Sequence, residues 1–251
     1  MILMDNRRCA IVTGSASGMG YAMIQRLAKD GYNVVVNYHS ENRIAAANEL
    51  VEYCTALGVG AIAVRADVSK PEECDVLVKL AVENFGRIDV LVNNAGTTNL
   101  TPMQKMSNED FDRVMKVNAY GTFYMMRSVT PIMKKQHSGS IINISSVGGL
   151  YGSPWSIGYA ASKGAVISLT KTAAKELAIS KIRVNAIAPG GCDTGGMGDM
   201  SEPQIKNLLN YITLKRLAKP DEMAGAVSFL ASEDASYITG HVLEVSGGAM
   251  M

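Results

Sequence analysis

CAIVTGSASGMG, residues 9–20, starts as an apolar, β-branched run, passes through three glycines and leads into a helical pattern. Glycines allow a tight strand-to-helix turn, and they let the backbone approach a bound phosphate at the N-terminus of the helix that follows. The spacing from Gly14 to Gly20 is Gly-x-x-x-Gly-x-Gly, which departs from the commoner dinucleotide fingerprint. Its position after the first strand and before an apolar helix still favours a phosphate-binding turn.

The strand-then-helix order of this stretch repeats along the chain. Seven short apolar runs are typical of buried strands, at Cys9–Thr13, Asn33–Tyr38, Ala61–Arg65, Asp89–Asn93, Ser140–Ser145, Arg183–Ile187 and Val242–Val245. Helical patterns lie between them, at Met19–Asp30, Glu41–Leu57, Pro71–Phe85, Asn108–Lys135, Gly158–Ser180 and Pro220–Ala231. Strands that are apolar on both faces need helices on both sides. The sequence therefore predicts a single-domain α/β fold, a doubly wound, seven-stranded parallel sheet with helices on both faces.

Composition narrows the class of protein. Apolar residues make up 47% of the 251 residues and charged residues 19%, which is typical of a globular chain. The formal net charge of +1 gives no field that would attract nucleic acid or an anionic membrane. No apolar run approaches the ~20 residues that span a bilayer, and Met1 to Arg8 lacks the apolar core of a signal peptide. We expect a soluble, cytoplasmic protein that binds neither nucleic acid nor membrane.

The cysteines and histidines give no sign of a metal site. Cys9, Cys54, Cys74 and Cys192 are scattered without a Cys-x-x-Cys pair, and the three histidines lie far apart. The sequence predicts four unpaired thiols in a reducing compartment and no bound metal.

Further motifs follow the glycine-rich turn in a recognisable order. They are Asp67-Val68, Asn93-Asn94-Ala95-Gly96, Asn118, Ser146, Tyr159-x-x-x-Lys163, Asn185, and Pro189-Gly190 with Thr194. Together with Thr13–Gly20 they resemble the short-chain dehydrogenase/reductase family over almost the whole chain. The resemblance implies a Rossmann fold, an NAD(P) cofactor and hydride transfer between a secondary alcohol and a ketone.

Tyr159 and Lys163 are the candidate catalytic pair. Residues four apart in a helix lie on one face. A free tyrosine titrates near ~10, and a cation ~4 Å away at an effective dielectric of ~20 is worth roughly 4 kcal/mol, or about three pK units. The spacing therefore predicts a tyrosine whose pKa is lowered toward working pH. A surface Tyr and Lys on an amphipathic helix is the competing interpretation, and the surrounding Ser-Ile-Gly-Tyr-Ala-Ala-Ser-Lys string after the fifth strand favours the catalytic pair.

The resemblance assigns roles to four catalytic residues. It makes Tyr159 the general acid/base and Lys163 the group that lowers its pKa and holds the nicotinamide ribose. Ser146, thirteen residues before Tyr159, would orient the reacting oxygen, and Asn118 would support a water chain from Lys163. Because all four are present, we expect an active enzyme.

The resemblance also places the cofactor in contact with several segments of the chain. The implied contacts are Gly14, Ser15, Ser17, Gly18, Met19, Gly20, Asn37, Tyr38, His39, Ser40, Asp67, Val68, Asn94, Ala95, Gly96, Tyr159, Lys163, Pro189, Gly190, Cys192 and Thr194. Cys192 departs from the family, which usually carries Ile or Val there.

The end of the second strand bears on the choice between NADP and NAD. An NAD site usually places Asp or Glu there. This chain has Asn37-Tyr38-His39-Ser40, with no carboxylate before Glu41 and with Arg43 one helical turn on. Ser17, where many NADP enzymes carry a basic residue, points the other way. We expect NADP(H) to be preferred and NAD(H) to be usable.

The substrate pocket is expected from Thr97–Leu100, Val147–Trp155 and a glycine-rich segment around residues 191–212, which is either a substrate lid or an ordinary surface loop. The sole tryptophan, Trp155, precedes Tyr159 by four residues. An apolar wall is predicted from Leu150, Tyr151, Trp155, Met197 and Met200. This favours a bulky apolar ketone, such as a hydroxysteroid-like compound.

Three further functions stay open. Much of the chain resembles 3-oxoacyl-carrier-protein reductases, although the basic patch that such enzymes need is thin around Lys134-Lys135 and Lys181. The family's usual Val-Asp-Gly-Gly is Val245-Ser246-Gly247-Gly248 here. A glucose or polyol dehydrogenase is the second candidate, and a nucleotide-binding regulatory protein is the third. The resemblance also implies a homotetramer, packed partly through the Asn108–Lys135 and Gly158–Ser180 helices.

Overall fold

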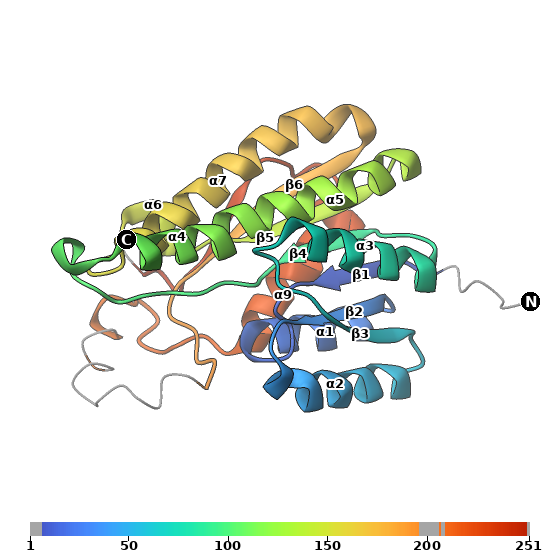
Figure 1. The fold of residues 1–251 in the computed structure, drawn as a ribbon, viewed down its shortest axis with the longest axis horizontal. Coiled ribbons are helices and arrows are strands. Elements are labelled where there is room, and N and C mark those ends of the chain that lie inside the picture. Colours follow the sequence, from blue (N-terminus) through green and yellow to red (C-terminus); the bar gives the residue numbers. More distant parts are fainter. Residues whose placement is uncertain (1–6, 196–205, 207–208, 250–251) are drawn as a thin grey trace, which may run out of the picture.

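The computed structural model describes residues 7–195, 206 and 209–249 (Figure 1). Within them one parallel sheet has the strand order β3-β2-β1-β4-β5-β6-β7. The strands are β1 (Cys9–Val12), β2 (Asn33–Tyr38), β3 (Ala61–Arg65), β4 (Val90–Asn93), β5 (Gly139–Ile144), β6 (Ile182–Pro189) and β7 (Val242–Val245). The predicted doubly wound, seven-stranded sheet is confirmed.

Helices cover both faces of the sheet (Figure 1). One face packs against α1 (Gly18–Lys29), α2 (Ile44–Ala56) and α9 (Pro220–Ala231). The other packs against α3 (Pro71–Phe85), α5 (Gly121–Gln136) and α7 (Ile157–Leu177), with α4 (Asn108–Met115) lying against α7. The chain therefore forms three layers, helix, sheet and helix.

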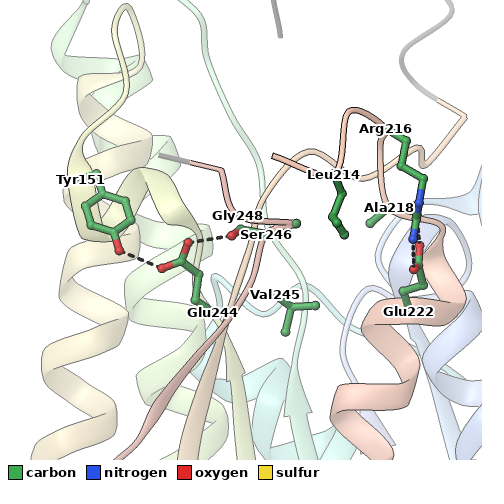
Figure 2. A pocket seen from close by; sticks show the side chains of 10 residues that line it. Tyr151, Leu214, Arg216, Ala218, Glu222, Glu244, Val245, Ser246 and Gly248 are labelled. Carbon is green, nitrogen blue, oxygen red and sulfur yellow. Dashed lines mark hydrogen bonds and ion pairs between the residues drawn. The ribbon is translucent and has the colours of Figure 1, made fainter. Parts of the chain in front are cut away.

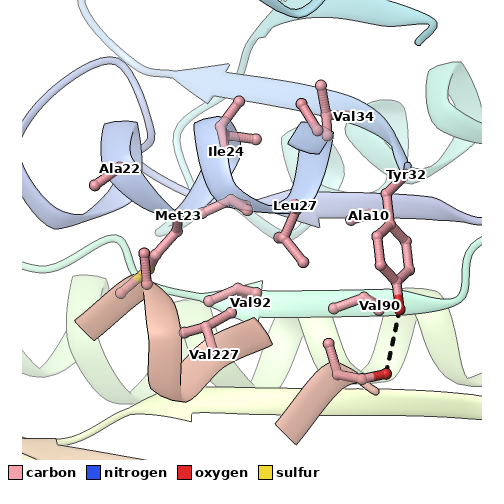
Figure 3. Packing of buried hydrophobic residues seen from close by; sticks show 14 of the residues in the cluster. Ala10, Ala22, Met23, Ile24, Leu27, Tyr32, Val34, Val90, Val92 and Val227 are labelled. Atoms are coloured by element: carbon pink, nitrogen blue, oxygen red, sulfur yellow. Dashed lines mark hydrogen bonds between the residues drawn. The ribbon is translucent and has the colours of Figure 1, made fainter. Parts of the chain in front are cut away.

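Alternate residues of the strands feed the two cores. In β1, Ala10 and Val12 join the core under α1, whereas Cys9 and Ile11 join the opposite core. Figure 3 shows Met23 and Leu27 of α1 packed in the first of these cores. Burial of such side chains is the main driving force for the fold, at about 1.5–3 kcal/mol for each large aliphatic group.

The strand order reverses beside β1, which lies between β2 and β4. A ligand crevice forms outside the carboxyl ends of the strands at such a point, because the flanking connections leave to opposite faces. The glycine-rich turn after β1 and the loop after β4 both lie at this crevice.

The predicted helix Asn108–Lys135 is not regular. It comprises α4, a π-helical segment at Lys116–Tyr120, and α5. The short helix α6 (Val147–Tyr151), which the apolar pattern did not predict, follows β5. Most of the expected lid, Met197 and Met200 included, lies outside the described residues. Within the described part of the chain, no helix is long and apolar enough to cross a membrane, and no cluster of three or more metal-ligating side chains is found.

Candidate active site

The turn after β1 requires glycine at two positions for conformational and steric reasons. Gly14 has φ +61° and Gly18 has φ +56°, the left-handed region that favours glycine. A methyl group at Gly14 would lie 2.9 Å from Ala95 Cα, so the turn packs directly on the loop after β4. Gly18 faces Thr194, whose side chain would lie 3.4 Å from a methyl group there.

Two asparagines hold this turn in place. Asn37, at the end of β2, accepts a hydrogen bond from Gly14 N (2.9 Å). Asn94 donates through Nδ2 to Thr13 O (2.9 Å) and Gly14 O (3.1 Å). The turn is therefore fixed from both neighbouring strands before any ligand binds.

The start of α1 is free to bind an anion. Its N-cap residue, Ser17, makes no side-chain capping bond, and no acidic residue occupies the first turn. The N–H groups at this end point outward and carry the positive end of the helix dipole. A dinucleotide pyrophosphate fits these donors, with Gly18 allowing close approach.

A cavity of about 610 Å³ extends from this turn along the carboxyl ends of the strands. The predicted contacts that line it are Gly14, Ser17, Gly18, Met19, Asn37, Tyr38, His39, Asp67, Val68, Asn94, Ala95, Gly96 and Thr194. The sequence motifs did not assign Thr97, Arg113 or Val117 to the cofactor, and all three line the cavity too. Val117 and Arg113 lie one and two helical turns before Gly121, on the helical stretch that carries Asn118. Their proximity to Asn118 is the sequence signal that could have indicated them.

Some predicted contacts lie behind the cavity wall. Ser15 is fully buried and pairs with the backbone of Asn37, and Gly20 packs on Asn94. Ser40 donates to Asn42 Oδ1 (2.6 Å). Pro189, Gly190 and Cys192 are also outside the lining of this cavity, and Gly190 packs on Ser246 instead.

The side chain of Asn37 is occupied by the protein itself. Its Oδ1 takes the Gly14 N–H, and its Nδ2 donates to Ala66 O (3.0 Å) and Val64 O (3.3 Å). The residue is 1% exposed. Both ends of its amide therefore bind backbone already, so the Asn37 side chain offers the cofactor no unpaired group, and its role as a cofactor contact stays a prediction. His39 and Arg43 are the polar side chains at this end of the cavity with exposed positions.

Tyr159, Lys163 and Ser146 meet at the end of β5. Ser146 caps α6, accepting a hydrogen bond from Gly148 N (3.0 Å), and its side chain also hydrogen-bonds the Tyr159 phenol. Lys163 is 4% exposed, and its Nζ donates to Ile144 O (2.6 Å) and lies 5.8 Å from the centre of the Tyr159 ring. The four-residue spacing does place Tyr159 and Lys163 on one helix face.

Asn118 reaches the same place from the π-helical segment. Its Oδ1 accepts from Thr97 N (2.8 Å), and its Nδ2 donates to Thr97 O (2.9 Å) and Ser162 Oγ (2.9 Å). A methyl group at Gly96 would lie 3.4 Å from Asn118 Oδ1 and 3.5 Å from Lys163 Nζ. Gly96 therefore lies beside both groups, where the cofactor cavity meets the catalytic residues.

Burial changes the expected acidity of the pair. Burial raises the pKa of Tyr159, and the hydrogen bond from Ser146 offsets this only in part. Burial also lowers the pKa of Lys163 to about 8. The spacing predicts a Tyr159 pKa lowered by Lys163, and the structure differs, because desolvation of the phenol is the largest influence and the group that acts against it is Ser146.

A second cavity, of about 540 Å³, lies at the end of β7 (Figure 2). On one side Glu244 accepts hydrogen bonds from Tyr151 Oη (2.8 Å) and Ser246 Oγ (2.7 Å). On the other, Arg216 forms a two-pronged ion pair with Glu222 (2.6 and 2.7 Å), which lowers the pKa of Glu222 to about 2. Ser246, where the family usually has Asp, thus donates to Glu244. Glu244 in turn links β7 to α6, because it also accepts from Tyr151.

Comparison with known proteins assigns the family. The sequence profile described as "Enoyl-(Acyl carrier protein) reductase" matches residues 14–250. A solved structure of a Burkholderia xenovorans protein, titled as a short-chain dehydrogenase/reductase, superposes with a TM-score of 0.89 at 35% identity, covering 97% of this chain and 98% of the other. The chain belongs to the short-chain dehydrogenase/reductase family. It is therefore an NAD(P)-dependent oxidoreductase, as its motifs predicted.

The curated relatives share a more specific name. The 3-oxoacyl-[acyl-carrier-protein] reductase FabG of Staphylococcus epidermidis is 42% identical over 244 residues, 97% of this chain and 99% of that protein. A 3-oxoacyl-[acyl-carrier-protein] reductase of Synechocystis is 44% identical over 244 residues, 96% of each chain. Both relatives match this chain almost from end to end, so no separate domain accounts for the likeness.

Proposed function

We propose that this chain reduces the ketone of a 3-oxoacyl thioester to the 3-hydroxy compound, using NADPH. The meeting of Tyr159 and Ser146 beside buried Lys163 carries the reaction class. The full-length relatives support the substrate class. Their names favour a 3-oxoacyl thioester over the predicted hydroxysteroid-like substrate, which neither name supports.

The chain's own residues supply the proton and orient the ketone. NADPH, held by the glycine-rich turn and the cavity after it, would supply the hydride that the ketone carbon takes up. Ser146 Oγ accepts from Gly148 N, so its one O–H, which binds the Tyr159 phenol in this structure, would turn to donate to the oxygen of a bound ketone. The Tyr159 O–H gives its proton to that oxygen as negative charge develops there. One hydride and one proton convert the ketone into the alcohol.

The acidities of the site suit reduction near neutral pH. The raised pKa of Tyr159 keeps the phenol protonated, which is the form that donates. With a pKa of about 8, Lys163 is mostly charged at pH 7 and can return a proton to the phenolate. We propose that Asn118 fixes the loop at Thr97 beside this relay.

NADPH is the proposed cofactor because β2 itself ends without a carboxylate that lines the cavity, and the acidic residue that does line this end, Asp67 after β3, accepts hydrogen bonds from Ser69 N (2.9 Å) and Ser69 Oγ (2.8 Å). Glu41, the first carboxylate after β2, is held by Arg65 (2.8 Å) and does not line the cavity. His39 and Arg43 do line it. A cation beside the ribose favours a 2′-phosphate through charge-assisted hydrogen bonds.

Arg43→Ala is expected to raise the KM for NADPH about tenfold while changing the KM for NADH less than twofold, since a surface contact to a phosphate is worth about 1.4 kcal/mol. Steady-state kinetics with both cofactors measures this. Lys79→Ala, an exposed lysine of α3 that lies off the cavity, is the control. Equal KM changes for the two cofactors would remove Arg43 from the 2′-phosphate site.

A substrate panel tests the proposed function. NADPH oxidation is followed with 3-oxoacyl, trans-2-enoyl and steroid ketone substrates, and NADP⁺ reduction is followed with sugars, which react in the reverse direction. We expect turnover of 3-oxoacyl thioesters to exceed all others. Preference for the enoyl thioester, which the profile's description would fit, or for a steroid would refute the proposal. Comparing coenzyme A and carrier-protein thioesters then shows which carrier is used.

We also propose a cytoplasmic homotetramer. Tyr120 and Phe123, near the start of α5, are 48% and 43% exposed, and Arg127 lies over the Phe123 ring. Exposed aromatic side chains on adjacent helical turns are typical of a subunit contact. Sedimentation equilibrium measures the mass, and a stable monomer at micromolar concentration would contradict this.

A further inference from the structure

We propose that Trp155 determines substrate specificity, forming the wall on which the acyl chain of an apolar 3-oxoacyl substrate packs. This rests on the proposed function. It assigns the acyl-chain site to the one tryptophan of the sequence.

The backbone at Trp155 is strained. Its φ is +58°, in the left-handed region. Glycine adopts this region freely, whereas a bulky aromatic residue there is a clear outlier. Such strain persists only where the surrounding structure enforces it, and it is concentrated at ligand sites.

The surrounding structure does enforce it. Thr101 N donates to Trp155 O (2.6 Å), and Thr101 pairs with Ser156 in a parallel β-bridge. Ser156 is 1% exposed, and its hydroxyl donates to Ser153 O (3.1 Å). The loop that follows β4 therefore fixes the backbone at Trp155 O and Ser156, and Ser156 in turn binds back to Ser153, on the other side of the indole.

The indole ring is not packed in the protein's own core. The Trp155 side chain is 70% exposed although its backbone is held on both sides. A strained, well-held residue with an exposed aromatic ring indicates that the ring is kept for a contact outside this chain's packing.

Trp155 directly precedes the catalytic helix in the chain. Ser156 is the N-cap of α7, and Tyr159 stands in the first turn of that helix. Exposed apolar side chains occur in the segments on either side of it, with Leu100 at 74% and Met103 at 69% after β4 and Leu150 at 38% in α6. A substrate whose ketone meets Tyr159 must lead its remaining atoms out of the site beside these segments. An alkyl chain is the part of a 3-oxoacyl thioester that gains from an apolar wall.

The sole tryptophan provides a direct probe of this contact. NADP⁺ and a 3-oxoacyl coenzyme A form a complex that cannot react, because no hydride is present. With a long acyl chain we expect the indole emission to shift to shorter wavelength at saturation, and with an acetoacetyl group to change little. Unchanged emission with the long chain would overturn the proposal. If the emission wavelength changes with protein concentration and not with the long-chain ligand, the indole lies in a contact between copies of the chain, and the proposal is overturned as well.

Two variants separate the ring from the strain. Trp155→Ala removes the ring and keeps a side chain at positive φ, whereas Trp155→Gly removes both. In each we expect kcat/KM for a long-chain 3-oxoacyl thioester to fall about tenfold, with the acetoacetyl value within twofold of wild type, since each buried methylene contributes roughly fourfold. Trp155→Gly is also expected to unfold at a higher temperature than Trp155→Ala, because glycine relieves the strain.

Tyr237→Ala is the matched control, since Tyr237 is a fully exposed aromatic residue that lies before β7 and does not line the cofactor cavity. It should leave the ratio of long-chain to short-chain kcat/KM unchanged. If both Trp155 variants keep the wild-type ratio of long-chain to short-chain kcat/KM while short-chain turnover persists, the role of Trp155 is refuted and the proposed function still stands. If wild type reduces no 3-oxoacyl thioester, the proposed function fails and this assignment fails with it.

Discussion

Tyr159→Phe is expected to lower kcat for ketone reduction about a thousandfold, because it removes the O–H that supplies the proton and leaves the ring in place. Lys163 and the hydrogen bonds of the glycine-rich turn do not depend on the phenol oxygen, so NADPH should bind with unchanged affinity. Rapid-quench or steady-state kinetics gives kcat, and quenching of the Trp155 emission by NADPH gives the affinity.

Tyr237→Phe controls for this experiment, since it deletes the same oxygen from an exposed tyrosine away from the site. Its kcat should equal that of wild type. A Tyr159→Phe variant that keeps more than about a tenth of wild-type kcat would show that solvent supplies the proton. The assignment of Tyr159 as the acid would then be withdrawn, whereas the cofactor site would stand.

The sheet could be predicted because its signal is local. Strands buried on both faces are continuous apolar runs, and β2, β3 and β7 begin and end where the sequence predicted. The end of β6 was missed by two residues, since Pro189 continues the strand beside the edge strand β7. Whether proline is tolerated there depends on how the neighbouring strand β7 pairs with it, and the local sequence pattern does not reveal that pairing.

The π-helical segment could not be predicted for a different reason. Asn118 is held by Thr97 and Ser162, residues that lie far from it in sequence. Thr122 Oγ1 also donates to Asn118 O (2.7 Å). A widened turn is stable when such contacts replace the regular helical bonds, and π-bulges often occur at functional sites. The apolar periodicity of Asn108–Lys135 carries no trace of these partners.

The roles of single side chains depend on burial, which spacing does not give. The spacing places Tyr159 and Lys163 correctly on one face, but the direction that it predicts for the Tyr159 pKa is wrong. The resemblance implies Asn37 as a cofactor contact, whereas tertiary structure pairs its amide with the glycine-rich turn and with Ala66. Trp155 is expected on or just before the catalytic helix, and its positive φ carries no sequence signal because the residue is not glycine.

Lys163→Met is expected to abolish most activity and to stabilise the fold. Burial lowers the pKa of Lys163 from 10.5 to about 8, which corresponds to roughly 3 kcal/mol of unfavourable free energy for the charged form in the folded state. Methionine fills a similar volume without charge. Loss of the hydrogen bond to Ile144 O offsets about 1 kcal/mol. The net gain of about 2 kcal/mol should raise Tm by about 4–8 °C at pH 7.

The pH dependence of this gain has a definite sign. Below pH 8 Lys163 is charged in both states, so the folded protein carries the whole penalty. Between pH 8 and 10.5 the unfolded state binds more protons than the folded state, so the free energy of unfolding rises with pH. Above 10.5 the lysine is neutral in both states and the penalty is gone. The raised pKa of Tyr159 acts in the opposite direction at high pH, but it does so in both proteins and largely cancels from their difference.

The Tm difference between Lys163→Met and wild type should therefore be largest near neutral pH and shrink toward pH 10.5. Lys171→Met, an exposed lysine on the same helix, should show neither the gain nor its pH dependence. In the activity that remains, the ascending limb of the pH–rate profile for alcohol oxidation, on which Tyr159 loses its proton, should move to higher pH, because the phenolate loses its cation. An unshifted profile would leave Lys163 without an electrostatic role. A variant no more stable than wild type at pH 7 would show that the buried ammonium is fully compensated, and that the lowered pKa of Lys163 is not a property of the folded protein.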